Sequence, residues 1–69
     1  MRLSARNQLK GRISSIDLGA VMATVTIQLD GGQEVVASIT KDSVVALGLD
    51  VGDAVTAVIK STEVMVGKE

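Results

Sequence analysis

The sequence predicts a small all-β domain that contains one short helix. Apolar and polar residues alternate over several short stretches, which is the spacing of a strand with one buried face. Turn signals such as Asp30-Gly31-Gly32 separate these stretches. Helical spacing occurs only once, after the third alternating stretch. This pattern is typical of a curled sheet with a single helical connection.

The first three predicted strands lie in the N-terminal half of the chain. Leu9–Ile16 is rich in Ile and Ser and ends at a turn around Asp17-Leu18-Gly19. Every second side chain is apolar from Val21 to Leu29 and again from Glu34 to Ile39. The residues Asp30-Gly31-Gly32 between them tolerate positive φ, so these two stretches are predicted to form a hairpin.

A short helix is predicted directly after the hairpin. Thr40 is suited to be its N-cap, because a threonine hydroxyl can accept a hydrogen bond from a free N–H of the first turn. Val44 and Leu47 are three residues apart and share one helical face, and Gly48 suits the left-handed position that follows a helix. The predicted helix therefore spans Lys41–Leu47.

Two further strands complete the predicted fold. Ala54–Lys60 follows a turn at Leu49–Asp53, and Glu63–Val66 is predicted as a short last strand. The order strand, strand, strand, helix, strand, strand is that of an OB-type five-stranded barrel. The sequence contains no internal repeat, low-complexity tract or proline-rich linker, so we expect a single domain over residues 1–69.

The composition indicates a chain that needs a partner. A lone core of this size supplies roughly 3–5 kcal/mol, and with no Cys, His or aromatic residue the chain has no disulfide or zinc site to add to it. The sequence is nevertheless 46% apolar. We therefore expect a homo-oligomer. The sequence shows no secretory signal and no apolar run of membrane-spanning length, so we expect a soluble, cytoplasmic protein.

Several classes of function fit the sequence poorly. An enzyme would lack the usual general base and the best nucleophile, and the adjacent Lys60 and Ser61 would point to opposite faces of a strand. Asp50 and Asp53 are interpreted as turn residues rather than cation ligands. A binder of single-stranded nucleic acid would lack aromatic stacking residues, and the net charge of −1 disfavours phosphate contacts.

An oxyanion site fits the remaining chemistry. Arg6 and Lys60, near opposite ends of the chain, each have hydroxyl or amide residues beside them, including Ser4 and Ser61. Molybdate, tungstate or sulfate presents acceptors on every side, so guanidinium, ammonium, hydroxyl and backbone N–H donors suit it. Assembly would bring the N-terminal segment of one chain against the Lys60 strand of another. The competing interpretation is that the N-terminal cations are the solvated charges of an edge strand.

These residues lie in runs that resemble one family. The run Ser4-Ala5-Arg6-Asn7-Gln8-Leu9-Lys10-Gly11 resembles the opening signature of the molbindins, the small molybdenum-pterin-binding-type proteins of the Mop, or TOBE-like, domain family. Similar runs continue along the chain, at residues 19–21, 40–44, 47–49, 52–53 and 59–65. The resemblance therefore spans nearly the whole sequence.

The resemblance implies an OB-type barrel assembled as a hexamer, a trimer of dimers with exchanged N-terminal strands, which binds molybdate or tungstate at subunit interfaces. It implies the following oxyanion-binding residues: Ser4, Ala5, Arg6, Asn7, Ala20, Val21, Lys60 and Ser61. Ala20 and Val21 would offer backbone N–H groups. Met22 stands where relatives often carry a polar residue, which argues against a second site that uses that side chain.

The function that the resemblance implies is intracellular storage or homeostasis of molybdenum. Molybdate or tungstate would be the bound ligand, with no catalytic cofactor, no metal bound as a cation, no nucleic acid and no membrane. The same domain also occurs in molybdate-responsive transcription regulators and transporter ATPases. A structural or regulatory OB-type accessory module is therefore the alternative.

Overall fold

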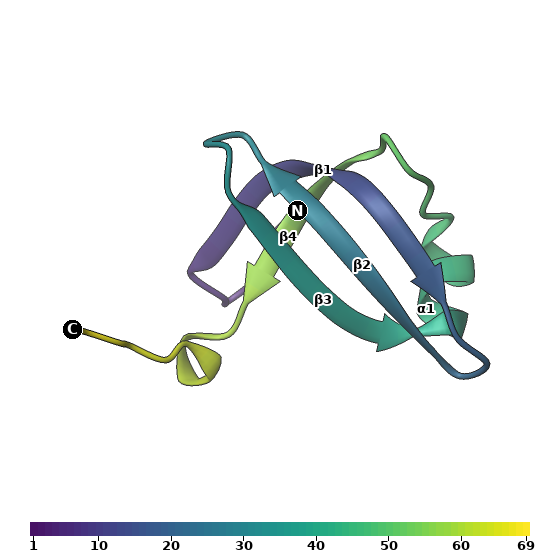
Figure 1. Ribbon diagram of the computed structural model, residues 1–69. Coiled ribbons are helices and arrows are strands. Elements are labelled where there is room, and N and C mark those ends of the chain that lie inside the picture. The colour runs from purple at the N-terminus through teal and green to yellow at the C-terminus, as the bar shows by residue number, and fades with distance from the viewer.

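The computed structural model describes all residues from Met1 to Glu69 and contains one antiparallel sheet of four strands in the order β3-β2-β1-β4. The sheet is strongly curved, and the short helix lies at one end of it (Figure 1). The elements in chain order are β1 Asn7–Leu18, β2 Met22–Leu29, β3 Glu34–Thr40, α1 Lys41–Leu47, β4 Ala54–Ile59 and the 3₁₀ helix η1 Ser61–Glu63. None of its helices has the length and hydrophobicity that crossing a membrane would require.

The predicted hairpin and helix are confirmed. β2 pairs with β3 as an antiparallel hairpin, with Val25 opposite Ala37. Thr40 Oγ1 accepts the N–H of Ser43 at 3.1 Å, as an N-cap does. Gly48 ends α1 at φ 62°, a left-handed conformation that glycine adopts without a Cβ penalty.

β1 is longer than predicted and is the central strand of the fold. Its first half pairs with β4 and its second half with β2, and Gly11 lies opposite both Val55 and Leu29. A Cβ at Gly11 would lie only 2.4 Å from the carbonyl oxygen of Gln28, so only glycine fits without a shift of the backbone. An irregularity between Ile13 and Ser15 shifts the pairing with β2. Both features lie where β1 passes from one partner strand to the other.

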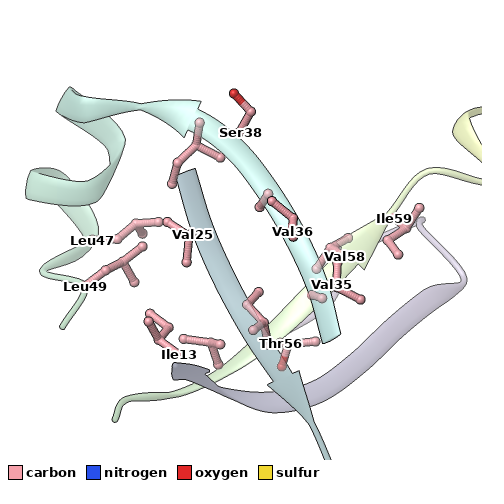
Figure 2. A pocket seen from close by; sticks show the side chains of 15 residues that line it. Ile13, Val25, Val35, Val36, Ser38, Leu47, Leu49, Thr56, Val58 and Ile59 are labelled. Atoms are coloured by element: carbon pink, nitrogen blue, oxygen red, sulfur yellow. The ribbon is translucent and has the colours of Figure 1, made fainter. Parts of the chain in front are cut away.

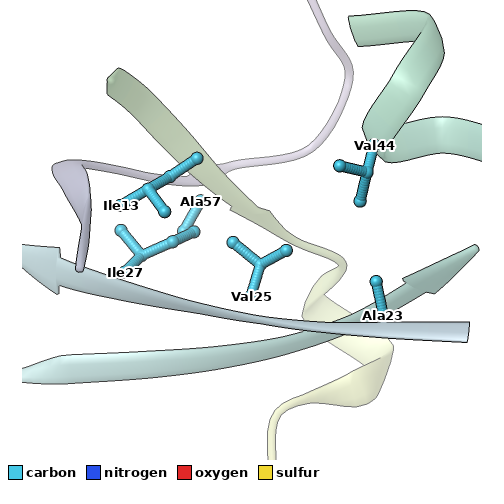
Figure 3. Close-up of a cluster of buried hydrophobic side chains, with 6 residues drawn as sticks. All are labelled: Ile13, Ala23, Val25, Ile27, Val44 and Ala57. Atoms are coloured by element: carbon cyan, nitrogen blue, oxygen red, sulfur yellow. The ribbon is translucent and has the colours of Figure 1, made fainter. Parts of the chain in front are cut away.

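The core occupies the concave side of this sheet. Val44 of α1 is buried with side chains of all strands except β3 (Figure 3). The buried cluster consists of Ile13, Ala23, Val25, Ile27, Val44 and Ala57. The three from β2 belong to the face that the alternation predicts to be buried. Val21 belongs to the same alternation but precedes β2, and it is 71% exposed.

The predicted fifth strand is absent from the isolated chain, which therefore forms a half-barrel instead of a closed one. Ser61–Glu63 forms η1, in which the Glu63 N–H donates to the Lys60 carbonyl oxygen at 2.9 Å. The chain after β4 continues into η1, and residues 64–69 project away from the sheet (Figure 1).

Candidate oxyanion site

The pairing of β1 with β4 brings the two cationic segments together within one chain. Asn7, the first residue of β1, lies opposite Ile59, the last residue of β4. The Cα atoms of such an opposed pair are about 5 Å apart. Arg6 directly precedes Asn7 and Lys60 directly follows Ile59, so both cations adjoin the end of this ladder. We call the group Ser4, Ala5, Arg6, Asn7, Lys60 and Ser61 the Arg6–Lys60 corner.

The Arg6–Lys60 corner presents hydrogen-bond donors that the chain itself does not use. The side-chain hydrogen bonds of the protein involve none of Ser4, Arg6, Lys60 and Ser61, and these four residues are exposed. The backbone N–H groups of Lys60 and Ser61 also donate no hydrogen bond within the chain. The segment before β1 is held by Gln8, whose side-chain amide donates to the Ala5 carbonyl oxygen at 2.9 Å.

The charge of the Arg6–Lys60 corner favours anions. It contains two cations and no acid, and Glu63 is the acid nearest to it in sequence. No group of three His, Cys, Asp or Glu side chains gathers anywhere in the protein in a way that could hold a metal cation. The donors and the charge therefore suit an anion that accepts hydrogen bonds on several sides.

Ala20 and Val21 form a second, separate part of the predicted site. They lie in the turn between β1 and β2, where the Gly19 N–H donates to the Met22 carbonyl oxygen at 2.8 Å. The Val21 carbonyl oxygen accepts the N–H of Lys41 at 2.8 Å, which ties the turn to the start of α1. The N–H groups of Ala20 and Val21 donate no backbone hydrogen bond, so this turn offers two free donors.

Lys41 is a residue near this turn that the sequence reasoning did not select. Its backbone contact with Val21 brings another cationic residue to the turn. The register of the hairpin places Met22 opposite Thr40 and therefore sets Lys41 beside Val21. The sequence signal for Lys41 was its place in the run 40–44, which resembles the family.

A single chain does not bring all eight predicted residues together. The Arg6–Lys60 corner lies at the start of β1, and the Ala20–Val21 turn follows its end. At about 3.3 Å per residue, a strand of this length spans roughly 35 Å, and its curvature shortens that only in part. Six of the residues belong to the segments at the start of β1 and the end of β4, and two belong to the turn after β1, so one small ion cannot contact both groups of the same chain.

Comparison with known proteins identifies relatives of this fold. The family model of the TOBE domain matches residues 3–66. Molybdenum-pterin-binding protein 3 of Clostridium pasteurianum is 47% identical over 66 residues, which cover 96% of this chain and 97% of the relative. A molybdate binding protein from Sporomusa ovata has a solved structure that is 46% identical, with a TM-score of 0.92 over 99% of this chain and 100% of that one.

A third similar protein is the cytoplasmic molybdate-binding protein ModG, solved with molybdate bound. It is 49% identical with a TM-score of 0.84, and the match covers 88% of this chain and 43% of ModG. These likenesses confirm the resemblance to the molbindins and extend over nearly the whole sequence. The chain belongs to the TOBE domain family, among the small molybdenum-pterin-binding proteins.

Proposed function

We propose that this protein binds molybdate or tungstate as an intact oxyanion and serves as an intracellular, cytoplasmic store or buffer of molybdenum. The observation that supports the proposal is the Arg6–Lys60 corner, where two cations and unused N–H and hydroxyl donors adjoin the paired ends of β1 and β4. The two solved structures named above, similar over most of this chain, are described as molybdate-binding. The ion is bound and released without chemical conversion.

The donor set suits a fully deprotonated tetrahedral dianion. Such an ion has only acceptors, so each guanidinium, ammonium, hydroxyl or N–H donor finds a partner. Phosphate retains a proton near neutral pH, and that proton would face a donor in a site without a carboxylate. Charge-assisted hydrogen bonds contribute about 1.5–3 kcal/mol each, and micromolar affinity needs about 8 kcal/mol, so several donors must converge.

A site between subunits would bring several donors to one ion. The Arg6–Lys60 corner of one chain would face the Ala20–Val21 turn of another, so that two side-chain cations and two backbone N–H groups surround the ion. The separation of the two clusters along β1 supports this arrangement. The assembly that we propose is a hexamer, a trimer of dimers, with the N-terminal segment exchanged between subunits and a fifth strand completing each barrel.

Titration calorimetry with sodium molybdate tests the ligand role of Arg6. Arg6→Ala should weaken binding by about tenfold or more, because one charge-assisted hydrogen bond is lost. Lys10→Ala is the matched control, since it removes the same charge from an exposed position on β1, outside the Arg6–Lys60 corner. Equal affinities of the Arg6 variant and the unmodified protein would remove Arg6 from the site.

Native mass spectrometry with and without molybdate tests the position of the site. Six subunits with bound oxyanion are expected, and ion occupancy should disappear when the chains are separated. A monomer that keeps tightly bound molybdate would contradict a site between subunits. Sulfate and phosphate at the same concentration serve as competitors and report the preference of the site.

A further inference from the structure

Three of the proposed ligands lie in a segment that a single hydrogen bond holds to the fold. Ser4, Ala5 and Arg6 precede β1, and no backbone hydrogen bond involves residues 1–6. Among the side-chain hydrogen bonds, one alone reaches this segment, from Gln8 Nε2 to the Ala5 carbonyl oxygen at 2.9 Å. We call it the Gln8–Ala5 bond. It fixes the ligand-bearing segment relative to the strand.

The Gln8–Ala5 bond is anchored on a paired part of the sheet. Gln8 is the second residue of β1 and lies opposite Val58 of β4. Val58 and its neighbour Ile59 line an apolar groove of about 610 Å³ between β3 and β4 (Figure 2). Gln8 does not line that groove, and its own side chain is exposed. Replacing Gln8 should therefore leave both the sheet and the groove intact.

The Gln8–Ala5 bond also sets the direction of a backbone donor in the Arg6–Lys60 corner. A carbonyl oxygen can only accept, so the amide of Gln8 presents its NH₂ group to Ala5. The Ala5 carbonyl and the Arg6 N–H belong to one planar trans peptide, in which the two groups point in opposite directions. The Arg6 N–H therefore points away from Gln8, and it donates no hydrogen bond within the chain.

A segment that is ordered in advance binds an ion more tightly than a mobile one. A mobile segment loses conformational freedom when it binds, and that loss weakens the affinity. The Gln8–Ala5 bond orders the segment before the ion arrives. It also polarises the peptide between Ala5 and Arg6, because linked hydrogen bonds strengthen one another. Both effects favour donation from the Arg6 N–H.

We propose that Gln8 is a positioning residue of the oxyanion site. Its side-chain amide holds the peptide between Ala5 and Arg6 in the orientation that binds the ion, and it does so without contacting the ion. This inference rests on the proposed function, because it assigns a role at the same site. The Gln8–Ala5 bond joins residues three apart in one chain, so it persists if the N-terminal segment is exchanged between subunits.

Gln8→Met tests this role, and Gln28→Met is its matched control. Methionine has about the length of glutamine but no N–H group to donate. Gln28 makes the same kind of bond, from its side-chain amide to the Gly32 carbonyl oxygen at 2.8 Å, in the β2–β3 hairpin. Each substitution removes one exposed amide-to-carbonyl bond. Any general effect on stability should therefore be shared by the two variants.

Two measurements separate a positioning role from a structural one. In titration calorimetry with sodium molybdate, Gln8→Met should bind about three- to tenfold more weakly, as the loss of one hydrogen bond predicts. Gln28→Met should bind as the unmodified protein does. In nuclear magnetic relaxation of the ion-free protein, the order parameters of the Ala5 and Arg6 N–H groups should fall in Gln8→Met from about 0.85 toward about 0.6, the range of flexible backbone. They should stay unchanged in Gln28→Met.

Other outcomes would overturn the proposal. Equal molybdate affinities of Gln8→Met and the unmodified protein would remove Gln8 from the site and leave the proposed function in place. Weaker binding with unchanged order parameters would make Gln8 a direct ligand instead of a positioning residue. Equal weakening in Gln28→Met would indicate a general loss of stability. An unmodified protein that binds no molybdate would end the proposed function itself, and the role of Gln8 with it.

Discussion

At the scale of single residues, local rules predicted some positions well and others not at all. Thr40 and Gly48 bound the helix as expected, because a cap depends only on neighbouring residues. The relation between Arg6 and Lys60 depends on the pairing of β1 with β4, which alternation within either strand does not encode. The separation of Ala20 from Arg6 depends on the length of β1 and could not be read from the residues themselves.

Gly11 gives a prediction at this scale. Gly11→Ala should lower the free energy of unfolding by about 2 kcal/mol or more, because the added Cβ would overlap the Gln28 carbonyl oxygen and Ile27. Urea unfolding at a fixed protein concentration measures the change. Gly31→Ala is the control, since a Cβ there meets no atom within 4 Å and its φ is not positive. Equal loss of stability in both variants would show that the close approach at Gly11 is unimportant.

At the scale of secondary-structure elements, a prediction succeeds where the element is stabilised by contacts between residues that are close in sequence. The hairpin β2–β3 and the helix α1 are formed by consecutive residues, and both were predicted within one residue of their bounds. β1 extends beyond its predicted ends at both Asn7 and Leu18, because pairing with two different strands prolongs it. The predicted strand at Glu63–Val66 failed because a strand needs an accessible edge, and η1 turns the chain away from the nearest one.

The cap of α1 provides a prediction for this element. Thr40→Ala should cost about 1 kcal/mol, because the N–H of Ser43 loses its acceptor, and the melting temperature should fall by about 4–8 °C. Differential scanning calorimetry measures the change in melting temperature. Thr40→Ser keeps the hydroxyl and should restore most of the stability. If the serine variant melts as early as the alanine variant, the methyl group of Thr40 rather than its hydroxyl stabilises the helix.

At the scale of the whole molecule, the chain is an incomplete structure. Its core contains six buried hydrophobic side chains, while large apolar residues such as Val36, Leu47 and Met65 remain exposed. The composition predicted this surplus of apolar surface, but only the fold shows that part of it, at Val36, Leu47 and Val58, lines the groove between β3 and β4. The composition gives the amount of apolar surface, and the fold is needed to locate it.

Because the single chain is incomplete, we predict that the stability of the protein depends on its concentration. For an assembly that unfolds to monomers, each tenfold rise in concentration adds about 1.4 kcal/mol per associating subunit. Melting temperatures of the unmodified protein should therefore rise between micromolar and millimolar samples. Chains lacking residues 64–69 should show a weaker dependence. A melting temperature that stays constant over this range would identify a protein that is stable as a single chain.

The unpaired edge of β3 has a consequence for the newly made chain. An uncharged run without proline, in which three of five residues are β-branched, has the composition of segments that aggregate into fibrils; here it is Val35, Val36, Ala37, Ser38 and Ile39. Glu34 and Lys41 place a charge near each end of this run, as gatekeeper residues do. Neutralising both charges should shift expression from the soluble fraction into inclusion bodies. Newly synthesised chains would then associate with one another through this run before they reach their native assembly.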